Sequence, residues 1–184
     1  GKGDTSQKLT LMKTSADSLK KSADALNDSS LWEKKKIKKK DEKTGEEIEV
    51  EDYDWDKITK AVKSFVEDYN DVVKEAGESN TKDVLRNASW MTGMTDKNSN
   101  MLAKIGITIG KGNKLELDED ALKQADISSL KTVFTGYNSF VSKISQKATG
   151  ISNAANRASA TYTNNGTYSK TDSSLTSSKI DKEV

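Results

Sequence analysis

Apolar and small residues recur at alternating spacings of three and four in three stretches of the chain, which we call the first, second and third seams. The first seam is Leu9, Met12, Ala16, Leu19, Ala23 and Leu26. The second seam is Ile58, Val62, Phe65, Tyr69, Val72 and Ala76. The third seam is Leu130, Phe134, Tyr137, Val141, Ile144, Ala148, Ile151 and Ala155. A spacing of about 3.5 residues places each seam on one face of an α-helix, and such helices bury their seams by packing together.

The residues around the seams predict where these helices begin and end. The first helix is expected over residues 5–28, and the second begins after Asp54 as its N-cap and ends at Gly77 as its C′ residue. We expect the third helix to be unbroken from residues 126–128 to about 159, with its 145–158 part packed against the first helix in either direction. Shorter helices are predicted over residues 82–90, 95–104 and 119–125, the first two separated by Gly93.

Two segments have the patterns of β-hairpins. In residues 31–53, the basic run Lys34–Lys40 and the acidic run Glu46–Asp52 flank a turn-like sequence that ends at Gly45, so folding the segment back pairs Lys with Glu. In residues 105–117, Ile and Leu alternate with small or polar residues on both sides of Gly110-Lys111-Gly112-Asn113.

Composition favours a thin core. Hydrophobic residues make up 33% of the 184 residues and charged residues 32%, and the mean hydropathy is -0.79. We therefore predict a mainly α fold: an elongated helical bundle with coiled-coil-like seams over residues 1–159, carrying the two small β-hairpins. Residues 160–184 are rich in Ser, Thr and Asn and are expected to form a flexible tail. An open set of amphipathic helices that pack only on a partner is the alternative architecture.

The chain contains no His, Cys or Pro, which removes the usual general base, thiolate chemistry and the commonest metal ligand. We therefore predict no catalytic, cofactor-binding or metal-binding residues, and a protein that is not an enzyme. A hydrolase with paired carboxylates is the remaining catalytic alternative, but a thin bundle offers little room for its pocket. Gly110-Lys111-Gly112 does not fit a phosphate-binding loop, because that pattern needs four residues between its glycines and Ser or Thr after the Lys.

Three other groups of residues could carry binding chemistry. If the backbone of this segment is extended, the carboxylates of Asp52, Asp54 and Asp56 would align and could bind calcium weakly. The acidic residues at 118–120 are better explained as residues of a helix start. Trp32, Trp55 and Trp90 could form a carbohydrate platform, but we expect them to pack at helix ends. The basic run is explained by a solvated hairpin, because the acidic run cancels its field and the whole chain carries 30 basic and 29 acidic residues. No nucleic acid partner is therefore expected.

The ends of the chain say little about its compartment. No stretch approaches the ~20 apolar residues of a transmembrane helix, and no signal peptide is visible. The chain begins at Gly1 rather than Met, which is typical of a fragment or a processed form.

The stretch from Trp55 to Ile144 resembles the C-terminal helical part of the flagellar filament-cap (hook-associated) proteins. Phe65–Val73 is similar to the family's "fv-x-x-yN-x-l" helix, and Val133–Gly136 to its "v-x-x-lF-x-G" element. Leu102–Thr108 followed by Asn113–Leu122 is similar to its "L-x-x-iGi…dGkL-x-lDe-x-x-L" hairpin and helix. The 34–50 hairpin occupies the place of the family's β-rich head domains, so the resemblance is to a reduced or divergent relative.

The resemblance implies a non-catalytic structural or assembly protein at the bacterial flagellum. It also implies extracellular or cell-surface action through contacts with flagellin-like proteins or with other copies of the chain, so an oligomer is expected. The alternative is an unrelated secreted or cell-surface binding module that uses the charged hairpin or exposed aromatic residues for recognition.

Overall fold

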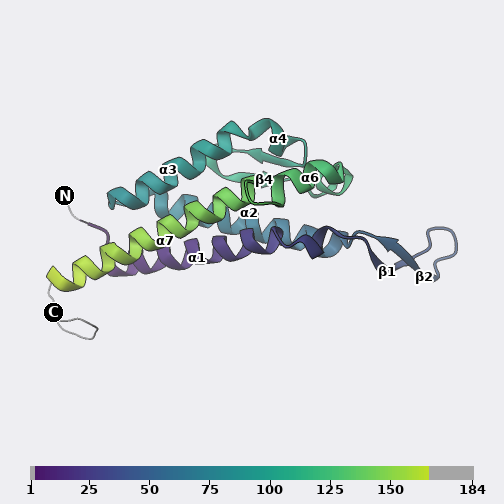
Figure 1. Cartoon of the computed structure of the whole chain (residues 1–184), viewed down its shortest axis with the longest axis horizontal. Coiled ribbons are helices and arrows are strands. Elements are labelled where there is room, and N and C mark those ends of the chain that lie inside the picture. The colour runs from purple at the N-terminus through teal and green to yellow at the C-terminus, as the bar shows by residue number, and fades with distance from the viewer. Residues whose placement is uncertain (1–2, 166–184) are drawn as a thin grey trace.

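A computed structural model of the chain describes residues 3–165 and confirms the predicted mainly α fold with two small hairpins. Four long helices form an antiparallel bundle (Figure 1): α1 (Ser6–Leu26), α2 (Trp55–Gly77), α3 (Lys82–Lys97) and α7 (Phe140–Asn165). The helices α1 and α3 each pack against both α2 and α7, so the four enclose one core.

Two insertions connect the long helices. Between α1 and α2 lie η1 (Ser29–Trp32), β1 (Lys35–Lys40) and β2 (Glu47–Asp52). Between α3 and α7 lie α4 (Ser99–Ala103), β3 (Ile107–Ile109), η2 (Lys111–Asn113), β4 (Leu115–Leu117), α5 (Glu119–Gln124) and α6 (Ile127–Phe134). The β1–β2 hairpin projects from the end of the bundle opposite the beginning of α1 and the end of α7 (Figure 1).

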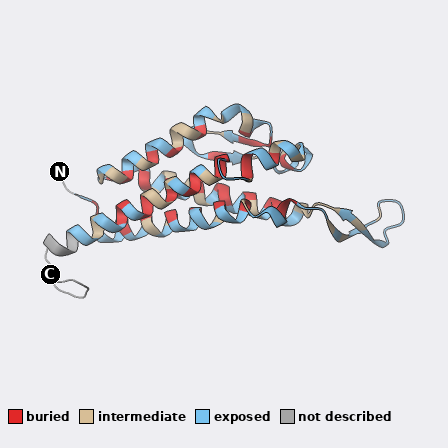
Figure 2. Cartoon of the chain, viewed as in Figure 1, coloured by how far each residue is buried: buried red, intermediate tan, exposed pale blue. Residues whose placement is uncertain are grey.

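The first and second seams lie inside the bundle. No residue of either seam is more than 2% exposed, and the buried positions follow the inner faces of the helices (Figure 2). Phe65 of the second seam packs edge to face against Phe134 and Phe140, with ring centroids 6.5 and 6.3 Å away. The seams therefore form an internal core, and the alternative of open helices waiting for a partner is wrong.

The third seam is divided between two helices, so the prediction of one unbroken helix is wrong. The helix α6 ends at Phe134 and α7 begins at Phe140, and Tyr137 between them is 84% exposed instead of buried. Gly136 turns the chain with a φ of 104°, and the Ser139 hydroxyl accepts a hydrogen bond from the Ser142 N–H at 3.2 Å. Tyr137 keeps the alternating three- and four-residue spacing of the third seam across this turn. The sequence pattern therefore gave no sign of the break.

Two helix boundaries also differ from the predictions. The helix α3 runs through Gly93 without interruption and ends before Asn98, so Gly93 does not separate two helices. A mid-helix Gly costs only about 1 kcal/mol relative to Ala, which packing can offset. Gly77 is the last residue of α2 rather than the residue after it, whereas Asp54 caps α2 as predicted by accepting a hydrogen bond from the Lys57 N–H.

The first helix and the end of the third pack together, as predicted, and they run antiparallel. The Ser145 hydroxyl donates to Asp24 at 2.7 Å, and the Ser152 hydroxyl donates to Asp17 at 2.6 Å. Both pairs are seven residues apart on each helix, which fixes one register of α7 on α1. The helix α7 continues to Asn165, past the predicted domain boundary at residue 160, and the rest of the predicted tail lies outside the described residues.

The predicted 105–117 hairpin is present as the antiparallel pair β3 and β4. Its turn places Gly112 and Asn113 at positive φ, as the Gly-rich sequence indicated. The Gly110-Lys111-Gly112 sequence is therefore a hairpin turn.

Candidate interaction surface

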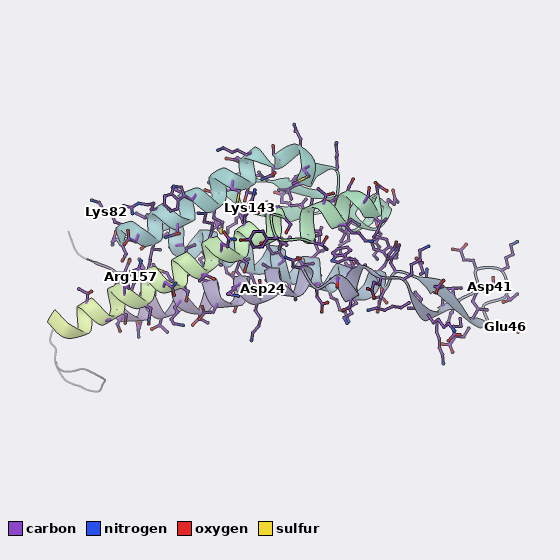
Figure 3. All side chains as sticks on the ribbon, in the orientation of Figure 1. Asp24, Asp41, Glu46, Lys82, Lys143 and Arg157 are labelled. Atoms are coloured by element: carbon purple, nitrogen blue, oxygen red, sulfur yellow. The ribbon has the colours of Figure 1, made fainter. Side chains whose placement is uncertain are left out.

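The β1–β2 hairpin owes its shape to a tight turn made by Asp41 and Gly45. The Asp41 carboxylate accepts a hydrogen bond from the Lys43 N–H at 2.8 Å, and the Asp41 carbonyl accepts from the Gly45 N–H at the same distance. Gly45 adopts a φ of 73°, which a residue with a side chain rarely takes. Asp41 and Glu46 lie at the far tip of the hairpin, well away from the bundle (Figure 3).

The register of the hairpin segregates its charges by strand. Every residue of β1 except Ile37 is Lys, and β2 pairs Glu47, Glu49 and Glu51 with Lys40, Lys38 and Lys36. The Lys39 ammonium also contacts Asp52 at 2.6 Å, and this hydrogen bond together with the Tyr53 N–H lowers the pKa of the Asp52 carboxyl. The sequence prediction of Lys opposite Glu is confirmed.

The base of the hairpin combines aromatic and charged groups. Tyr53 and Trp55 pack edge to face with centroids 6.0 Å apart, and the Lys34 ammonium lies 5.7 Å from the Tyr53 ring centroid. Both rings are half-buried, and with Lys38, Lys39 and Lys123 they line an open hollow of about 510 Å³. Asp54 and Asp56 also line this hollow, and Tyr and Trp are residues enriched at protein-binding surfaces.

The three Trp residues lie in different environments and do not form one platform. Trp32 is 1% exposed, stacks on Phe134 at 5.5 Å, and donates its indole N–H to the Leu26 carbonyl at 2.7 Å. Trp90 is 52% exposed on α3, where the Lys147 ammonium lies 4.6 Å from its ring centroid. The prediction of a packed Trp at a helix end is confirmed for Trp32 and is wrong for Trp90.

The acidic candidates serve as helix caps or ion-pair partners. Asp54 caps α2, Asp118 caps α5 by accepting a hydrogen bond from the Ala121 N–H at 3.1 Å, and Asp52 is bonded to Lys39. Within residues 3–165, no three acidic side chains converge in a way that could hold a metal ion.

Two Asn side chains, which the sequence did not single out as important, hold the insertion between α3 and α7 on the rest of the bundle. Asn70 of α2 donates to the Leu115 carbonyl at 3.0 Å and accepts from the Leu115 N–H at 2.7 Å. Asn27 after α1 donates to the Gly136 carbonyl at 3.2 Å and accepts from the Gly136 N–H at 2.8 Å. Asn70 follows Tyr69 within the quoted "yN" motif, which was the available signal.

A third polar contact joins the opposite end of the bundle. Asp4, which is 5% exposed, accepts hydrogen bonds from the Ser79 and Thr81 hydroxyls and the Asn80 N–H at 2.6–2.9 Å. Burial raises the pKa of the Asp4 carboxyl, but these hydrogen bonds outweigh it and hold the pKa below its ordinary value. Asp4 thereby ties the segment before α1 to the α2–α3 connection.

Comparison with known protein families settles which family the fold represents. Residues 78–183, more than half of the chain, match the model of the family described as "Flagellar hook-associated protein 2 C-terminus". The chain belongs to this family. No curated protein and no solved structure matches it in the same comparisons.

The match to the flagellar hook-associated protein 2 family confirms the resemblance inferred from the sequence motifs. The matched region begins directly after α2 and contains α3, the β3–β4 hairpin and α7. The charged β1–β2 hairpin lies outside it. In the described part of the chain, no helix combines the length and apolar character that a membrane span requires.

Proposed function

We propose that this chain is a non-catalytic structural part of the bacterial flagellum that acts outside the cell through protein–protein contacts. Its membership of the flagellar hook-associated protein 2 family carries the proposal. The architecture supports it, because the first two apolar seams are buried in an internal core and the charged β1–β2 hairpin projects beyond the bundle (Figure 1).

We propose the hollow at the hairpin base as the contact for a flagellin-like protein. Tyr53 and Trp55 offer two half-buried rings held by the start of α2, and Lys34 and Lys123 border them. Tyr and Trp are among the residues that most often dominate the binding energy at protein interfaces.

Light scattering of the full chain with and without flagellin from the same organism tests the proposal. We expect a mixed complex with the wild-type chain and about tenfold or more weaker binding for Tyr53→Ala and Trp55→Ala, which remove the anchor rings. Trp90→Ala is the control, because it removes an indole as large as that of Trp55, but an exposed one on α3, and should leave binding unchanged. The absence of any complex at high micromolar concentrations, or equal losses for all three variants, would reject this contact.

The alternative was an unrelated secreted or cell-surface binding module. The family match argues against an unrelated origin. One observation still favours recognition through exposed aromatic residues, namely the exposed Trp90 ring with the Lys147 ammonium beside it. A loss of flagellin binding in Trp90→Ala alone would indicate that this surface is the contact.

A further inference from the structure

The β1–β2 hairpin presents two bare edges. In the part of the chain that the structure describes, β1 and β2 form a two-stranded sheet and neither has a second strand beside it. The hairpin projects beyond the bundle, so no helix covers its edges (Figures 1 and 3). An uncovered edge strand is a template for pairing with another strand.

The turn determines which backbone groups point outward. The Asp41 N–H donates to the Glu46 carbonyl at 2.7 Å, and hydrogen-bonded pairs of an antiparallel ladder recur at every second position. Counting along the register, the pairs that exchange hydrogen bonds within the hairpin are 39 with 48, 37 with 50 and 35 with 52. The remaining positions turn their N–H and carbonyl groups outward: Lys36, Lys38, Lys40, Glu47, Glu49 and Glu51.

The outward positions therefore carry one charge on each edge. All three on β1 are Lys and all three on β2 are Glu. Pairing two β1 edges would set Lys against Lys, and pairing two β2 edges would set Glu against Glu, both of which are unfavourable across strands. A β2 edge against the β1 edge of a second copy instead repeats the Lys–Glu register found within the hairpin.

We propose that copies of this chain associate head to tail through their hairpins, the β2 edge of one copy pairing with the β1 edge of the next. Such a contact is heterologous, so it closes into a ring or continues as a filament and does not form a two-fold dimer. Ile48, which is 39% exposed on the opposite face from the outward Lys and Glu, would gain cover from the next hairpin. The inference goes beyond the proposed function, because it concerns only contacts between copies and involves no flagellin.

Proline at one outward position blocks one edge while sparing the hairpin. Lys38→Pro and Glu49→Pro each remove an N–H that the ladder within the hairpin does not use. Sedimentation of the full chain at low salt should show species larger than a dimer for the wild type, dissociating near ~1 M salt, where the Debye length is about 3 Å. Each Pro variant alone should be monomeric, and an equimolar mixture should form a one-to-one complex that stops there. Lys38→Thr and Glu49→Thr keep the N–H groups and should still associate.

Several outcomes would overturn the proposal. A wild type that stays monomeric, a single Pro variant that dimerises through its remaining edge, or a mixture that stays monomeric would each do so. Because flagellin is absent from this assay, its failure is separate from a failure of the proposed flagellar contact.

A second variant covers the case in which proline disrupts the hairpin itself. Exchanging the charges, with Glu at 36, 38 and 40 and Lys at 47, 49 and 51, keeps every opposite-charge pair within the hairpin. We expect this variant to self-associate as the wild type does, because a β2 edge against a β1 edge still joins opposite charges. A charge-exchanged variant that stays monomeric would reject the proposal.

Discussion

Asn70 and Leu115 are joined by two hydrogen bonds in which one side-chain amide replaces a neighbouring strand. The amide group of Asn70 donates to the Leu115 carbonyl and accepts from the Leu115 N–H, as the backbone of an adjacent strand would do. The β3–β4 hairpin has only two strands, so this contact satisfies a buried part of β4 and docks it on α2.

Asn70→Ala should lower the free energy of unfolding by about 1–3 kcal/mol, because it leaves the buried N–H and carbonyl of Leu115 without partners. Urea denaturation measures this loss, and amide exchange at Leu115 should become faster than at the core of α2. Asn153→Ala, on the exposed face of α7, is the control and should change stability by no more than about 0.5 kcal/mol. Equal effects of the two variants would contradict the docking role.

Phe65→Ala should lower the free energy of unfolding by about 3–5 kcal/mol, since Phe65 is fully buried between Phe134 and Phe140. Thermal unfolding followed by circular dichroism would show a sharply lower midpoint. Leu11, on the neighbouring helix α1 and 54% exposed, provides the control, because Leu11→Ala removes little buried area. An unchanged midpoint for Phe65→Ala would mean that the second seam is not a core.

Gly136→Ala and Gly93→Ala should shift stability in opposite directions. A Cβ at either position meets no atom within 4 Å, so only the backbone conformation distinguishes them. Gly136 has a φ of 104°, and a side chain there costs about 1–3 kcal/mol of strain. Gly93 lies inside α3, where Ala should add about 0.5–1 kcal/mol. Guanidinium denaturation of both variants checks the signs, and a destabilised Gly93→Ala would show that α3 is broken in solution.

Asp4 should make the stability of the bundle fall in acid. Its folded pKa lies below the ordinary value of 3.8, so its contribution is complete above that pH and is lost as the pH drops through the folded pKa. Asp4→Asn should therefore be less stable than the wild type at pH 7, by about 1–3 kcal/mol, because an amide cannot accept all three hydrogen bonds. The difference should narrow as the pH falls below the ordinary value of 3.8, because the unfolded wild-type chain takes up a proton there that the folded Asp4 carboxylate resists.

Urea titrations at several pH values measure this difference. Asp120→Asn is the control, since Asp120 is exposed in the first turn of α5 and should alter stability little at any pH. A constant gap between Asp4→Asn and the wild type from pH 7 to 3 would show that the carboxylate charge is not the source of the effect.

The seams and the hairpins were predictable because both are local patterns. A 3.5-residue apolar spacing specifies one face of a helix wherever the helix packs, and the opposite charges of Lys34–Lys40 and Glu46–Asp52 specify a strand pair through the intervening turn. The cap residues Asp54 and Asp118 were likewise visible, since a cap acts within three residues of itself.

Contacts between distant segments decided what the pattern left open. The third seam keeps its phase across Gly136, so only the bonds from Asn27, 109 residues away, show that the chain turns there and exposes Tyr137. Trp90 looks apolar in sequence, but in the fold its ring is 52% exposed beside Lys147 of α7. The sequence by itself determined the helical seams, the two hairpins and the family. The tertiary structure alone decided the antiparallel register, the break before α7 and the Asn contacts, because these depend on which segments meet in space.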